Sequence, residues 1–134
     1  MLDVLLTALS LPLLAMTSSA CVSPGITSAV ANQLGSNGDL TTYDVVITVK
    51  NAGPAAEPSS LLQSVQVFQD ATKVDQKGTP PLRAGGSATV HYRLQRSSEA
   101  RPGSTHLRFS LVIHDPHGPV ASCSTANSTY RINV

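Results

Sequence analysis

The sequence predicts an all-β domain, a sandwich of two antiparallel sheets with about seven strands. Two observations lead to this prediction. From residue 43 onward apolar residues recur at every second position, which is the period of a strand with one buried face and not that of a helix. Clusters of Gly, Pro, Asn and Asp separate these stretches, so the strands are short and joined by turns.

The composition is that of one ordinary folded domain. The 134 residues include nine Lys and Arg against eight Asp and Glu, with 41% hydrophobic and 13% charged residues. This length fits a single domain. The balanced charge gives no sign of a nucleic-acid partner or an anionic membrane surface, and the ordinary hydrophobicity argues against disorder.

Residues 1–20, MLDVLLTALSLPLLAMTSSA, predict a secretory signal peptide. Their uncharged apolar stretch, Val4–Met16, is too short to cross a bilayer core of about 30 Å, which needs roughly 20 helical residues. The small residues that follow form a cleavage site, so the mature domain is residues 21–134, without a membrane span. The stretch has no Lys or Arg before it, which is unusual for a signal, and a buried N-terminal element is the alternative.

The chain contains two cysteines, Cys21 and Cys123. In an exported protein an even number favours a disulfide, and closing a loop of about 100 residues contributes on the order of 4.7 kcal/mol in the chain-entropy treatment. Cys21 lies just before the expected first strand and Cys123 just before the last, so a parallel arrangement of these strands places the cysteines together. Acylation of Cys21 in a lipoprotein, or two free thiols, are the alternatives.

The first two expected strands differ in strength. Gly25–Ala31 predicts a weak first strand, and a polar loop over Gly35–Asp39 follows it. The segment YDVVITVKN, residues 43–51, alternates regularly, with its valines and isoleucine on one face. It ends at Asn51–Pro54, a turn whose proline cannot continue a ladder.

The middle of the chain predicts a hairpin and a loop. SVQVFQD, residues 64–70, directs two valines inward, while Phe68 breaks the alternation and covers the other face. A short run at Thr72–Asp75 can pair with this strand. The segment Gly78–Gly86 then forms a loop rich in residues that change the chain direction.

Three further strands complete the expected sandwich: SATVHYRLQ (87–95), THLRFSLVIHD (105–115) and STYRINV (128–134). Seven short strands in about 100 residues suit an immunoglobulin-like topology, and an up-and-down barrel is the alternative. The alternation predicts one inter-sheet core made of Val45, Ile47, Val49, Val65, Val67, Val90, Leu94, Leu107, Phe109 and Leu111.

Two segments resemble a known family. VVITVKNAGPAA (45–56) and PPLRAGGSATVHY (80–92) resemble the bacterial cell-adhesion-related domains, CARDB, and kindred immunoglobulin- and fibronectin-III-like repeats. In those domains a strand ends in an Asn-x-Gly turn, and a Leu-x-Ala-Gly-x-Ser motif opens a later strand. The resemblance implies a non-catalytic module of exported proteins that serves adhesion or assembly. It transfers no binding residues.

The sequence offers little for catalysis or metal binding. His114 and His117 flank Asp115, but neighbouring positions at a strand end alternate faces, so a solvated turn is expected. Ser87 lacks the surroundings of a nucleophile elbow, and Glu57 and Glu99 lie far apart in loops. We therefore expect no catalytic residues, no metal and no cofactor.

The function predicted from the sequence is an exported, non-catalytic immunoglobulin-like module, secreted or in the cell envelope, for protein binding, adhesion or envelope structure. A lipid-anchored lipoprotein of the same fold is the alternative, and a small secreted hydrolase is a third. A protein partner at the cell surface is expected. The candidate contact is an exposed strand edge at Lys73, Val74 and Asp75, because an edge offers unpaired backbone groups to a partner's strand.

Overall fold

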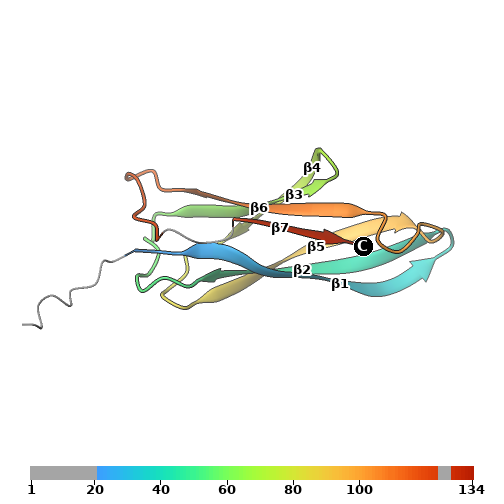
Figure 1. Cartoon of the computed structure of the whole chain (residues 1–134), viewed down its shortest axis with the longest axis horizontal. Helices are drawn as coiled ribbons and strands as arrows, with labels where there is room; N and C mark the ends of the chain where they lie inside the picture. Colours follow the sequence, from blue (N-terminus) through green and yellow to red (C-terminus); the bar gives the residue numbers. More distant parts are fainter. Residues whose placement is uncertain (1–20, 124–127) are drawn as a thin grey trace, which may run out of the picture.

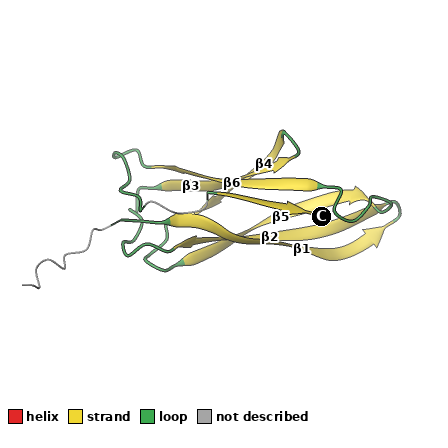
Figure 2. Ribbon diagram, viewed as in Figure 1, coloured by secondary structure: helices red, strands yellow, loops and turns green. Residues whose placement is uncertain are grey.

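A computed structural model describes residues 21–123 and 128–134, and the predicted signal peptide, residues 1–20, lies outside them. These described residues form seven strands and no helix (Figures 1 and 2). No helix of the length and hydropathy that a membrane crossing requires occurs in them. The strands are β1 (Pro24–Asn37), β2 (Leu40–Asn51), β3 (Leu62–Gln69), β4 (Thr72–Thr79), β5 (Ser87–Ser97), β6 (His106–His114) and β7 (Thr129–Asn133).

The strands form two separate antiparallel sheets that pack face to face. One sheet has the order β1-β2-β5 and the other the order β4-β3-β6-β7. Every pair of neighbouring strands in them is antiparallel. The predicted two-sheet sandwich is therefore confirmed, and the barrel alternative is wrong because no ladder joins the two sheets among these strands.

The inner faces of the sheets enclose a single aliphatic core around Phe109, which is completely buried. All ten residues that the alternation places in the core are buried, so the predicted strand phases are correct. Ile26, Ala29 and Leu82 join the same cluster, from β1 and from the loop before β5. These three were missed because their surroundings do not alternate in polarity.

Strand β1 is much longer than the sequence predicts. The polar loop expected over Gly35–Asp39 is wrong: β1 continues to Asn37, and Asn37 pairs with Leu40 of β2. Only two residues form the turn, and Gly38 adopts a φ of 62°, which glycine tolerates without strain. The second half of β1 is exposed, so backbone pairing, which needs no apolar residues, is sufficient to hold it.

Strand β4 pairs with β3, as the sequence suggests, but it extends to Thr79. The predicted loop that begins at Gly78 therefore begins two residues later. Thr79 is drawn into the sheet because its hydroxyl accepts a hydrogen bond of 2.7 Å from the buried Gln63 amide. β4 is an edge strand of its sheet, and Figure 1 shows the tip of the β3–β4 hairpin standing away from the sandwich.

The core assignment predicts unequal costs for two substitutions. Phe109→Ala leaves a cavity at the centre of the sandwich and is expected to lower the free energy of unfolding by about 3–5 kcal/mol. His91→Ala removes an exposed side chain on the outer face of β5 and is expected to change it by about 0.5 kcal/mol or less. Chemical denaturation of both variants measures the difference. Equal losses contradict the assigned strand phases.

Candidate functional site

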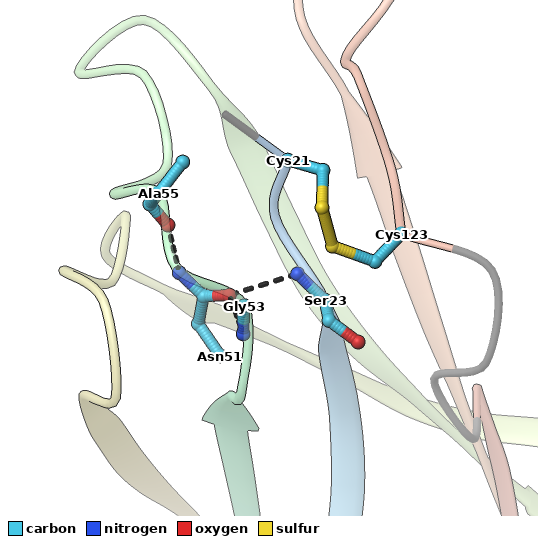
Figure 3. The surroundings of a disulfide bond; sticks show 6 residues. All are labelled: Cys21, Ser23, Asn51, Gly53, Ala55 and Cys123. Atoms are coloured by element: carbon cyan, nitrogen blue, oxygen red, sulfur yellow. Dashed lines mark hydrogen bonds between the residues drawn. A yellow bond between two sulfur atoms is a disulfide. The ribbon is translucent and has the colours of Figure 1, made fainter. Parts of the chain in front are cut away.

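The best-ordered polar site lies where β2 ends, around the buried side chain of Asn51 (Figure 3). Its Oδ1 accepts hydrogen bonds from the backbone N–H groups of Ser23 (2.9 Å) and Gly53 (3.1 Å). Its Nδ2 donates to the carbonyl of Ala55 at 2.8 Å, and more weakly to the carbonyls of Leu82 and Arg83 at 3.4 and 3.3 Å. One amide therefore joins three chain segments that no ladder connects.

The two segments that carry the family resemblance meet at this residue. The backbone N–H of Asn51 donates to Gly86 at 2.9 Å, and the N–H of Gly85 donates back to the Asn51 carbonyl at 2.8 Å. Gly85 adopts a φ of 72°, so a side chain there would be strained. The Asn-x-Gly turn and the Leu-x-Ala-Gly-x-Ser motif are thus two halves of one structural connection.

A disulfide closes the same end of the sandwich. Cys21 and Cys123 are bonded, with their Cα atoms 5.3 Å apart. Val22 forms a parallel bridge with Ser122 beside it, which is the arrangement of first and last segments that the sequence favours. A Cβ on Gly53 would lie 2.6 Å from the carbonyl oxygen of Cys21, so this turn needs glycine for close approach.

A buried carboxyl group lies next to this end. Glu57 is only 6% exposed, although the sequence places it in an ordinary loop. Its Oε1 accepts the N–H of Leu82 at 2.8 Å. Glu57 Oε2 and Gln63 Oε1 are the buried side-chain atoms of the described residues without a hydrogen-bond partner. Burial raises the pKa of Glu57 above its ordinary value of 4.5, opposed chiefly by the hydrogen bond from the Leu82 N–H.

The predicted edge residues lie on the exposed strand β4, where the structure adds a bulge and a side-chain hydrogen bond that the sequence does not indicate. Val74 is an extra residue in the ladder, because Lys73 pairs with Phe68 and Asp75 with Val67. Asp75 accepts the backbone N–H of Gln76 at 2.8 Å and lies 3.4 Å from the Lys77 ammonium group. The edge therefore has a bulge at Val74 and a carboxylate that covers one of its N–H groups.

The histidines do not come together. Asp115 accepts hydrogen bonds from the backbone of His117 and the hydroxyl of Ser60, and both lower its pKa. His91 of β5 contacts Asp44 of β2 at 3.1 Å, and His106 and His114 lie at the two ends of β6 in the other sheet. In the described part of the chain, no three His, Cys, Asp or Glu side chains lie close enough to hold a metal ion.

Among the described residues, the side chains considered for catalysis are not arranged as a nucleophile with a base or as a carboxyl pair. Ser87 is exposed at the start of β5 and has no side-chain hydrogen bond to a histidine. Glu57 is bonded to Leu82 beside the Asn51 end. Glu99 lies in the turn after β5, next to the β1–β2 turn at the opposite end. These two carboxyl groups therefore do not form a pair.

Comparison with known proteins shows which solved structure has a similar fold. No protein-family description and no curated protein sequence matches the chain. A solved structure does match: the CARDB domain of a Pyrococcus furiosus protein, with a TM-score of 0.59 over 88% of this chain and 96% of that one. The fold is CARDB-like. At 15% identity the match concerns the fold alone, and the di-metal ions with which that domain was solved belong to that protein.

The Asn51 contacts predict a large effect of a small substitution in this CARDB-like fold. Asn51→Ala leaves the buried N–H of Gly53 and the partly buried N–H of Ser23 without acceptors and is expected to lower the free energy of unfolding by about 2–5 kcal/mol. Asn32→Ala, on the exposed part of β1, is the matched control and is expected to change little. Denaturant titration measures both variants, and a small loss for Asn51→Ala contradicts its assigned role.

Because the pKa of Glu57 is raised in the folded chain, the free energy of unfolding is expected to depend on pH. The folded chain holds the Glu57 proton more tightly than the unfolded chain, so this contribution is complete below pH 4.5 and is lost as pH rises through the folded-state pKa. Glu57→Gln keeps an acceptor for Leu82 and supplies a permanent donor toward Gln63. We expect the variant to gain melting temperature relative to the wild type between pH 4 and pH 8. Glu99→Gln, which changes an exposed carboxyl group at the opposite end, is the control variant, and an equal gain there contradicts the role assigned to Glu57.

Proposed function

We propose that the mature chain, residues 21–134, is an exported, non-catalytic CARDB-like module that binds another protein outside the cytoplasm. The observation that carries this proposal is a disulfide-closed, CARDB-like sandwich with an exposed edge strand, β4. A disulfide is typical of oxidising compartments. The apolar segment 1–20 supports export as a signal peptide.

We propose a secreted or envelope protein without a lipid anchor. Acylation of Cys21 requires a free thiol, and the disulfide with Cys123 uses that thiol. Lipidation would in addition leave Cys123 as a free thiol outside the cell. The disulfide therefore favours cleavage before Cys21 by an ordinary signal peptidase over lipoprotein processing.

The proposed contact is the edge of β4 around Lys73, Val74 and Asp75. Alternate residues of a strand direct their N–H and C=O groups toward opposite neighbours. The N–H of Gln76 bonds to the Asp75 carboxylate, so Gln76, and Gly78 two residues later, present their backbone groups at the free edge. An incoming strand pairs with these groups once Asp75 swings away.

Two substitutions with opposite expected effects test this proposal. Immobilised mature protein captures partners from the native envelope, and the affinity of any recovered partner is then measured. Gln76→Pro removes the N–H that Asp75 covers and is expected to weaken binding at least tenfold, because proline is tolerated at an edge but cannot donate. Asp75→Ala uncovers the same N–H and is expected to strengthen binding.

Melting curves show whether both variants keep the core intact. The same preparation gives the mass of the mature chain before and after reduction, which reports cleavage before Cys21 and the disulfide. Undiminished binding by Gln76→Pro rules out the β4 edge as the contact. A fatty-acid mass on Cys21 rules out the unanchored form.

A further inference from the structure

A row of four cross-strand neighbours, three of them cationic, crosses the outer face of the four-stranded sheet. Its members are cross-strand neighbours: Lys73 of β4 pairs with Phe68 of β3, Phe68 with Arg108 of β6, and Arg108 with Arg131 of β7. Adjacent strands lie about 4.8 Å apart, so the row spans roughly 14 Å of backbone. Three of its four side chains are positively charged.

These side chains face outward because their neighbours fill the core. Leu107 and Phe109, on either side of Arg108, are buried. Tyr130 and Ile132, on either side of Arg131, pack against the same core. Alternation along each strand therefore places both arginines on the outer face of the sheet.

Arg108 and Arg131 are not neutralised within the described chain. The two ion pairs there join Lys77 to Asp75 and His91 to Asp44. The Cβ atoms of directly opposed residues lie about 4.5–5.5 Å apart, and like charges on directly opposed side chains destabilise a sheet. The sheet thus carries two directly opposed arginines, neither of which forms an ion pair with a carboxylate of the described residues.

Aromatic stacking holds one of the two guanidinium groups in place. The Arg108 guanidinium carbon lies 4.0 Å from the centre of the Phe68 ring, so the ring covers one face of the cation and leaves its N–H edge free. A shallow hollow adjoins it, lined by Asp70, His106, Leu107, Arg108, Arg131 and Asn133. Asp70 is the one carboxylate at its border and forms no ion pair with either arginine.

We propose that this outer face binds an acidic protein segment, with Arg108 and Arg131 each gripping a carboxylate. Planar guanidinium groups bind carboxylates with two parallel hydrogen bonds. In an extended segment, carboxylates two residues apart lie about 6.8 Å apart on one side, within reach of flexible side chains from neighbouring strands. The site lies on the face of the sheet, so it goes beyond the proposed edge contact and does not need it.

The charge distribution favours a short acidic segment over a long polyanion. The whole chain has a formal net charge of only +1. Nucleic acid and similar polymers are bound by broad basic surfaces, whereas here three cations lie in one row. Such a row suits a few carboxylates and gives no continuous track for a phosphate backbone.

The probe is a labelled peptide with Asp at alternate positions between Thr residues, and a peptide with Asn in place of Asp is its control. Binding is measured with the oxidised mature protein at 50 and 300 mM salt. We expect the Asp peptide alone to bind, with an affinity that falls at least threefold at the higher salt. Arg131→Gln is expected to weaken binding about threefold and Arg131→Glu at least tenfold.

Two control variants distinguish binding at this site from nonspecific electrostatic attraction and from binding at the edge of β4. Arg93→Ala removes an exposed arginine that lies opposite Asp44 on the other sheet, and it should change affinity by less than twofold. Gln76→Pro, which disables the edge, should leave peptide binding intact. Equal losses for Arg93→Ala and Arg131→Gln, or equal binding of the Asn peptide, overturn the proposal. Inorganic polyphosphate that binds as tightly as the peptide, with the same loss in Arg131→Glu, overturns the assignment to an acidic protein segment.

Discussion

The buried amide of Asn51 is the interaction on which the closed end of the sandwich depends. Where chain segments leave the sheets, their backbone groups lose ladder partners, and each buried group without a partner costs about 1–3 kcal/mol. A primary amide offers two donors and an acceptor. The Asn51 side chain therefore forms hydrogen bonds with backbone groups of three segments at once, before β1, after β2 and before β5. An aliphatic residue would fill the same volume and leave these groups unpaired.

Steric and covalent constraints act at the same end. Gly53 allows the turn after β2 to touch the backbone of Cys21 and Ser23, which any side chain would prevent. The disulfide then ties this N-terminal segment to the connection between β6 and β7. Polar, steric and covalent constraints thus concentrate at one end of the domain. The edge of β4 and the outer face of its sheet lie outside this network, so they are free to change without loss of the fold.

Balanced composition conceals an uneven surface. The acidic residues are spread over different elements: Asp44 faces His91, Asp75 faces Lys77, and Asp115 accepts a hydrogen bond from Ser60. Sheet register meanwhile aligns Lys73, Arg108 and Arg131, which are far apart in the sequence. These cations remain in water, so the sheet carries them without a large desolvation penalty. A recognition surface can therefore form on a chain whose net charge is close to zero.

The period-two strands, their inward faces and hence the core follow from the sequence alone, because a strand with one buried face must alternate in polarity. Two cysteines allow only one intramolecular disulfide, but the sequence left open whether it forms, and the folded structure brings Cys21 and Cys123 together. The length of β1 does not follow from the sequence, because its second half is held by backbone pairing with β2, which leaves no side-chain pattern. Tertiary structure also buried Glu57 and Asn51 and aligned Arg108 with Arg131. Such contacts depend on register and on loop packing between distant segments, which local sequence does not encode.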